Sequence, residues 1–201
     1  MTPEQYVQQK AVASGSSFYY AFLFLPAPRR AAITAFYAFC REVDDVVDEV
    51  TDPGVAQTKL AWWQAEVAKA FAGQPTHPVM QALMPHTADY GIEQRHLQAV
   101  IDGCQMDLEQ TRYLDYPNLQ RYCHLVAGEV GEVAAGIFGQ TNPQTTAYAH
   151  KLGQALQLRT REHPTGGIVR RTEPQRPRAR GGGKGWRDVA LKLRFATLEP
   201  N

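Results

Sequence analysis

The aspartates between residues 41 and 50 have the spacing of a metal site. Asp44 and Asp48 are four residues apart, and Asp45 lies between them. In a helix, side chains with this spacing lie one turn apart on the same face, so that both carboxylates can reach one cation. Mg²⁺ is typically held by one or two carboxylates, while water and substrate phosphates fill its other positions. The pattern therefore indicates a magnesium–phosphate site.

A charge run such as DDVVDE is more often a solvated helix face, and taken alone it favours that interpretation by about two to one. Two neighbouring features change the balance. Arg41 lies one turn before Asp44 in the same row, where a phosphate-binding cation would stand. The adjoining stripe is too apolar for a free surface helix. We therefore keep metal binding as the hypothesis.

The segment that positions these residues is 28–50, PRRAAITAFYAFCREVDDVVDEV, which has the periodicity of one long helix. At 100° per residue, its apolar side chains form a single stripe: Ile33, Phe36, Cys40, Val43, Val47 and Val50. A second row beside the stripe contains Tyr37, Arg41, Asp44 and Asp48. Because this row borders the stripe, the carboxylates should point along the core, where an unpaired charge is unfavourable unless a metal binds it.

The remaining chain predicts further helices and no strand, since no sustained alternation is bounded by turn residues. A helix begins at Thr2-Pro3, an aromatic run covers 18–25, and later helices cover 60–71, 92–109 and 117–137, with others starting at Pro78 and Pro143. Asp52-Pro53-Gly54 reads as a turn. The fold is therefore expected to be all-α, a bundle of about seven helices with a deep apolar centre.

Three further features each allow two interpretations. The serines before Phe18 are typical of an ordinary helix cap, although they could also cradle an anion. Glycines at positions 128, 131 and 136 permit close approach either of another helix or of a ligand chain. Asp107 could face the same cavity as Asp44, but a surface charge is the safer interpretation.

Composition points to one domain of 201 residues with a net charge of +1, which suggests neither a nucleic-acid nor a membrane-surface protein. Its three cysteines have no paired spacing, which favours buried, reduced thiols in a cytoplasmic protein. No stretch is apolar enough to span a membrane, and the N-terminus lacks the plan of a signal peptide. No feature indicates an oligomeric state.

Several linked motifs occur in the order and spacing of a known family: SSFYYAFLFLP, AFYAFCREVDDVVDE, DGCQMDLEQTRY, YCHLVAGEVGEV and LGQALQL. Together they resemble the squalene/phytoene synthase family of head-to-head prenyl transferases. They are most similar to bacterial members that make presqualene diphosphate or squalene for hopanoids. The resemblance covers about residues 8–158 and implies a truncated isoprenoid synthase-type helical bundle.

Such enzymes condense two farnesyl or geranylgeranyl diphosphates, after Mg²⁺ on an aspartate-rich motif has promoted ionisation of one of them. The resemblance implies metal binding and catalysis for Asp44 and Asp48, diphosphate binding for Ser17, Arg41 and Gln157, and catalytic cavity positions for Tyr37 and Tyr122. Metal and arginine would stabilise the leaving group, and an apolar cavity would protect the cation from water. Prenyl diphosphates are the implied partners, and oily products would suit peripheral membrane contact.

The resemblance ends after Leu158, where the family continues into a second aspartate-rich motif. Residues 159–201 contain no Asp-x-x-x-Asp and carry 11 Lys+Arg against 4 Asp+Glu, with six Gly and four Pro. This composition predicts a disordered basic tail rather than a basic appendage that binds nucleic acid or anionic lipid. We expect an out-of-frame or recombined segment, and hence an impaired enzyme. Another DDxxD-type isoprenoid synthase and an inactive helical partner protein remain the alternatives.

Overall fold

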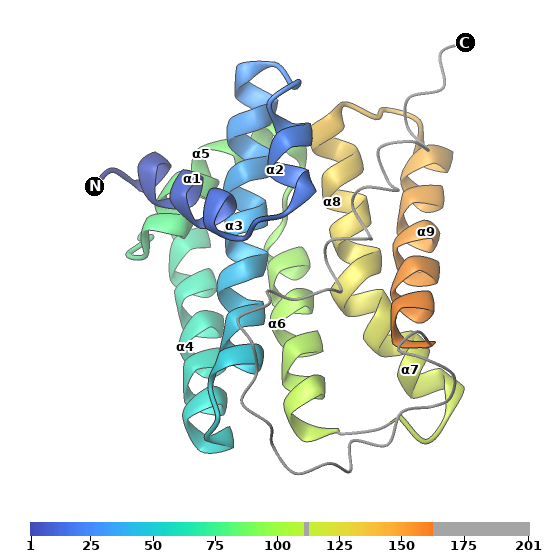
Figure 1. Cartoon of the computed structure of the whole chain (residues 1–201). Helices are drawn as coiled ribbons and strands as arrows, with labels where there is room; N and C mark the ends of the chain where they lie inside the picture. The colour runs from blue at the N-terminus through green and yellow to red at the C-terminus, as the bar shows by residue number, and fades with distance from the viewer. Residues whose placement is uncertain (111–112, 163–201) are drawn as a thin grey trace.

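The computed structural model describes residues 1–110 and 113–162, apart from the side chains of residues 17, 18 and 159–162. All regular structure in this part is helical, which confirms the all-α prediction, and the helices exceed the expected seven (Figure 1). They are α1 Pro3–Ala13, α2 Ser17–Phe22, α3 Ala27–Glu49, α4 Pro53–Phe71, α5 Pro78–Tyr90, α6 Gln94–Glu109, α7 Tyr116–Cys123, the π turn η1 His124–Gly128, α8 Glu129–Phe138 and α9 Pro143–Glu162. The boundary expected at residue 158 falls inside α9, and the basic tail lies outside the described residues.

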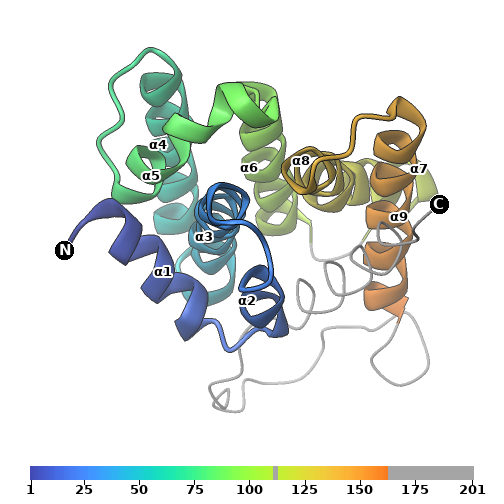
Figure 2. The ribbon, with the colours of Figure 1, turned by 90° about the horizontal axis from the view of Figure 1, so that it is seen from above.

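Helix α3 lies at the centre of the bundle, with α1, α2, α4, α5, α6 and α8 packed around it (Figure 2). Every residue from Ala32 to Arg41 is buried, so this part of α3 is enclosed on all sides rather than along one stripe. Burial on all sides is typical of a core helix. The stripe predicted from the sequence is therefore correct, but it understates how completely α3 is covered.

Helix starts follow the capping residues of the sequence. Thr2 forms a capping box with Gln5, and Asp115 accepts a hydrogen bond from the Asn118 N–H. Asp52 accepts from the Val55 N–H at 3.0 Å, so Asp52-Pro53-Gly54 begins α4. The prediction of a separate turn there was wrong, because a proline at the first helical position and an aspartate cap start a helix equally well.

The segment predicted as one regular helix, 117–137, contains the π turn η1. There the Glu129 N–H donates to the carbonyl of His124, five residues earlier. The spacing of Tyr122, Val126 and Val130 suits a π turn as well as an α turn, which is why the periodicity did not reveal it. The helix over the aromatic run 18–25 is also shorter than that run, since α2 ends at Phe22.

Helix α9 packs closely against η1 and α8 through glycines. A Cβ atom on Gly131 would lie 2.6 Å from the carbonyl oxygen of Ala149, and one on Gly153 would lie 2.2 Å from that of Ala127. A Cβ on Gly128 would meet the His150 ring at 2.7 Å, and one on Gly136 the Tyr90 carbonyl oxygen at 3.1 Å. Helix packing, rather than a ligand chain, therefore accounts for the small residues of this segment.

We expect Gly153→Ala to lower the free energy of unfolding by about 1–3 kcal/mol, because the new methyl group meets backbone that cannot move aside. The loss should appear even though alanine favours helix over glycine by about 1 kcal/mol. Urea denaturation measures the change. The matched control is Ala155→Ser on the exposed face of α9, which should stay within about 0.5 kcal/mol of the parent. Equal stability of both variants would contradict the close approach.

Candidate functional site

Arg41 is the centre of a charged group at one edge of the core. Its residue is only 8% exposed, and its Nη1 donates to Asp44 Oδ2 at 2.8 Å while its Nη2 contacts Asp45 Oδ1. From α1, Lys10 Nζ lies 2.9 Å from Asp45 Oδ2 and 2.9 Å from Glu42 Oε1. Asp45 is thereby engaged between Arg41 and Lys10, whereas Asp44 lies on the row that the sequence assigned to the site.

Electrostatics in this group favour the charged state of the arginine. Burial alone would lower the pKa of Arg41, but attraction by Asp44, Asp45, Tyr37 and Asp48 outweighs it and raises the pKa. Arg41 therefore carries a permanent positive charge in a place where few polar side chains remain charged. Such a fixed guanidinium is well suited to phosphate, which it can bind through two parallel hydrogen bonds.

The two predicted metal ligands differ in burial. Asp44 is half-buried with 22% of its side chain exposed, while Asp48 is exposed. The expectation that both carboxylates point along the core is therefore correct for Asp44 and wrong for Asp48. The physical reason is the position along α3: Val46 is the last fully buried residue, so the helix has left the packed centre by Asp48.

A second polar group joins the helices α6, α7 and α9. The Tyr122 hydroxyl of α7 donates to Asp107 Oδ2 of α6 at 2.7 Å. The same hydroxyl oxygen accepts from Gln157 Nε2 of α9 at 3.3 Å. Two predicted site residues thus meet at a half-buried aspartate, which the sequence interpretation had left as a surface charge. Its spacing of three residues from the inward-facing Cys104 could have indicated which face of α6 it lies on, although not its partner on α7.

Cys104 of α6 lies between the two groups. Burial raises the pKa of this thiol well above its ordinary value, and the negative charges of Asp44, Asp107 and Asp48 raise it further. Carboxylates from two helices therefore act on one buried position.

The other predicted residues are only partly placed. Tyr37 is buried, with its ring edge-to-face against Phe22 at a centroid distance of 5.8 Å. Ser17 begins α2, but its side chain lies outside the described residues, so its diphosphate role stays a prediction. The neighbouring Ser16 is 1% exposed, and its N–H donates to Ser14 Oγ at 3.2 Å.

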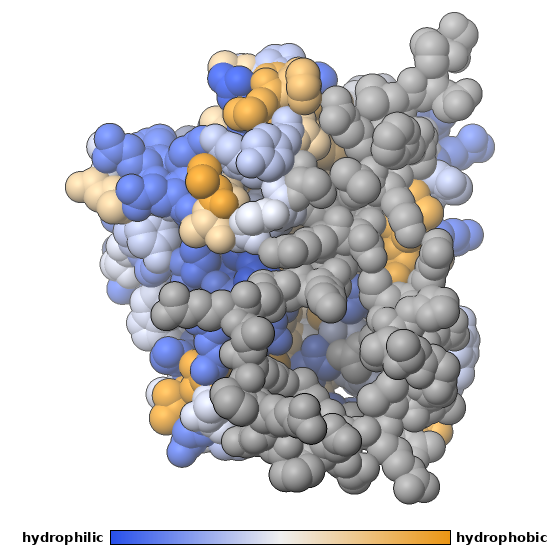
Figure 3. Space-filling view, in the orientation of Figure 1, coloured by the Kyte–Doolittle hydropathy of each residue, from blue (hydrophilic) through white to orange (hydrophobic). Residues whose placement is uncertain are grey.

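A hollow of about 510 Å³ opens on another face of α3, against α4. Charged side chains line it together with Trp62 and Trp63, and Asp45 is the aspartate of the motif that borders it. It is not the deep apolar cavity expected beneath Asp44 and Asp48. On the face seen in Figure 3, the coloured surface is largely hydrophilic with separate hydrophobic spots. None of the described helices is both long enough and apolar enough to cross a bilayer.

Solved structures of known proteins have this helical fold. Squalene synthase HpnC from Alicyclobacillus acidocaldarius superposes with a TM-score of 0.69 at 27% identity, over 79% of this chain and 59% of that one. A dehydrosqualene synthase crystallised with a ligand gives a TM-score of 0.65 at 27% identity, over 79% and 57%. The fold is thus that of an isoprenoid synthase-like helical protein.

The sequence relatives identify one family within this class of helical proteins. Residues 11–160 match the model of the squalene/phytoene synthase family, and this chain belongs to that family. The presqualene diphosphate synthase of Rhodopseudomonas palustris is 36% identical over 78% of this chain and 56% of its own length. The 15-cis-phytoene synthase of Synechococcus elongatus is 34% identical over 71% and 50%. The chain thus spans about half the length of these relatives.

We expect Tyr122→Phe to lower the free energy of unfolding by about 1.5–3 kcal/mol, because it removes a hydrogen bond to a charged group. Thermal or urea unfolding measures the loss. Tyr148→Phe, on the same bundle but with its residue 54% exposed, is the control and should change little. If the two variants were equally stable, Tyr122 would not be held by Asp107.

Proposed function

We propose that residues 1–158 bind a prenyl diphosphate as its magnesium complex, as the first half of a head-to-head prenyl transferase site. The observation that carries this proposal is the buried guanidinium of Arg41 beside Asp44, one turn before Asp48. One helix then offers both a donor for phosphate oxygens and oxygen ligands for the metal. Family membership supplies the substrate class, since relatives are named presqualene diphosphate synthase and phytoene synthase.

The residues fit a magnesium ion. Asp44 already accepts from Arg41 through Oδ2, but a carboxylate has about four lone-pair positions and can bind a cation without losing that bond. Asp48 is exposed and can turn toward the same ion. Magnesium, when bound there, would neutralise the charge that develops on the leaving diphosphate.

The protein's own groups would orient and protect the substrate. Arg41, Gln157 and Ser17 would donate hydrogen bonds to the diphosphate. Tyr122 has its hydroxyl proton directed at Asp107, so its phenol is held in one orientation. Tyr37 and the buried apolar side chains of α3 would keep water from a reactive cation.

Farnesyl diphosphate is the substrate we favour, with presqualene diphosphate or squalene as product; geranylgeranyl diphosphate and phytoene are the second choice. Since the sequence after Leu158 holds no second Asp-x-x-x-Asp motif, ionisation should be poorly supported. We therefore propose binding with little turnover.

Binding can be measured with the unreactive analogue farnesyl thiodiphosphate by calorimetry, with and without Mg²⁺. We expect Asp44→Asn and Asp48→Asn each to weaken Mg²⁺-dependent binding at least about tenfold, or ~1.4 kcal/mol. The control Asp89→Asn, an exposed residue in the last turn of α5, should bind like the parent. Unchanged affinity in both site variants would remove the metal assignment.

Turnover separates the alternatives. Incubation with farnesyl diphosphate and Mg²⁺ should give traces of presqualene diphosphate or squalene at most. An elongated or cyclised product would identify another kind of isoprenoid synthase. Binding without any product would identify a catalytically inactive partner protein, and turnover at full speed would contradict the predicted impairment.

A further inference from the structure

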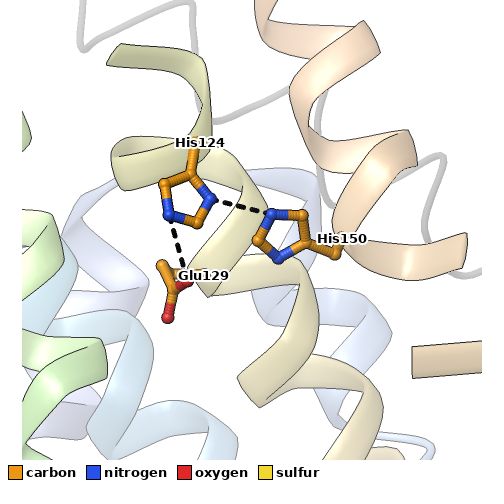
Figure 4. A group of neighbouring side chains, drawn as sticks. All are labelled: His124, Glu129 and His150. Atoms are coloured by element: carbon orange, nitrogen blue, oxygen red, sulfur yellow. Dashed lines mark hydrogen bonds and ion pairs between the residues drawn. The ribbon is translucent and has the colours of Figure 1, made fainter. Parts of the chain in front are cut away.

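Two histidines and a glutamate meet where the π turn packs against α9, and Figure 4 draws them together. His124 Nδ1 lies 2.9 Å from His150 Nε2, and His124 Nε2 lies 3.5 Å from Glu129 Oε1. His124 belongs to η1, Glu129 opens α8, and His150 comes from α9. No residue of this cluster belongs to the aspartate site on α3.

Neighbouring charges hold the cluster in place. Arg95 Nη1 lies 3.2 Å from Glu129 Oε2, and its Nη2 lies 3.3 Å from Glu132 Oε1. The other oxygen of Glu132, Oε2, lies 3.5 Å from His150 Nδ1. Because Arg95 contacts only one oxygen of each glutamate, the other oxygen of each faces an imidazole ring. The contact between Glu132 and His150 Nδ1 directs the Nε2 atom of the same ring toward His124.

His96 supplies an independent sign that a charged centre is incomplete here. It is 2% exposed, and its Nε2 has no hydrogen-bond partner among the described residues. Its Nδ1 accepts from the Glu93 N–H at 2.9 Å, which places the ring proton on Nε2. That N–H is aimed at the glutamates, 3.9 Å from Glu129 Oε2 and 3.8 Å from Glu132 Oε1.

The charges around the cluster leave room for one more cation. Glu132 Oε2 and Glu129 Oε1 each face an imidazole nitrogen at 3.5 Å, and the two rings face each other at 2.9 Å. The carboxylates of Glu93, Glu129 and Glu132 surround a single guanidinium, Arg95, so the excess charge is negative. The cluster is therefore built to hold a further cation.

We propose that this cation is a divalent transition-metal ion of the Zn²⁺, Co²⁺ or Ni²⁺ class, bound by His124, His150 and Glu129. The candidate ligand atoms lie within 4.8 Å of one another. Two ligands about 2.1 Å from one tetrahedral ion are about 3.4 Å apart, so a small tilt of the His124 ring would bring the two ring nitrogens to that separation. Imidazole ligands select such metals rather than Mg²⁺.

The surroundings match those of metal-binding histidines. Such a histidine usually gives its other ring N–H to a carboxylate, as His150 can to Glu132. Arg95 and His96 orient Glu129 from its far oxygen. The His124 side chain is 41% exposed, so its ring can tilt to admit an ion and a bound water. The ion would tie the π turn to α9.

The test is a Co²⁺ titration of the complete, tag-free 201-residue chain, followed by visible absorbance and calorimetry. We expect one Co²⁺ per chain, displaced by Zn²⁺ and unaffected by excess Mg²⁺. His124→Gln and His150→Gln should each weaken binding by more than the 10–100-fold typical of losing an outer-shell partner, and Glu132→Gln by about 10–100-fold. The control His86→Gln, a histidine of α5 outside the cluster, should bind like the parent.

Failure to bind Co²⁺ stoichiometrically, or equal binding by His124→Gln and His150→Gln, would overturn the proposal and leave a cluster that holds only a proton. Circular dichroism checks that each variant is folded. If a variant is not, NMR of the parent chain decides: Zn²⁺ must shift the ring protons of His124 and His150 and leave those of His86 in place. Shifts elsewhere alone would also overturn it.

Discussion

The buried charge of Arg41 is the constraint on which the candidate site depends. A guanidinium cannot shed its proton, so its desolvation must be offset by carboxylates at hydrogen-bonding distance. Asp44 and Asp45 provide these from the next turn, and Lys10 shares the charge of Asp45. Asp45 is thereby held from two sides, by Arg41 and by Lys10, whereas Asp44 pairs with Arg41.

The bundle gives this arrangement its rigidity. Because α3 is enclosed from Ala32 to Arg41, the row that carries Arg41 and Asp44 cannot rotate relative to the core. Helix α6 lies beside α3 and brings Cys104 and Asp107 to the same region. The polar groups thus come from several helices, but their positions follow from one central helix and the packing around it.

Local and periodic features could be predicted from the sequence, and irregular or long-range ones could not. The row on α3 and the adjacency of Arg41 and Asp44 follow from 3.6 residues per turn, and proline and capping residues locate most helix starts. Exposure of Asp48 depends on where neighbouring helices end, which no local pattern contains. Asp107 was misjudged because its partner, Tyr122, lies on a different helix.

The π turn η1 explains why the histidine cluster escapes a sequence reading and why it exists. In a regular α-helix, residues five apart lie on different faces, whereas a five-residue hydrogen-bonded turn brings them close together. His124 and Glu129 are such a pair, joined through the backbone and facing each other through their side chains. The same turn begins two residues after Tyr122, so the chain passes within a few residues from a tyrosine that contacts Asp107 to a histidine that contacts α9. Glycine at position 128 then leaves room for the His150 ring, which completes the group.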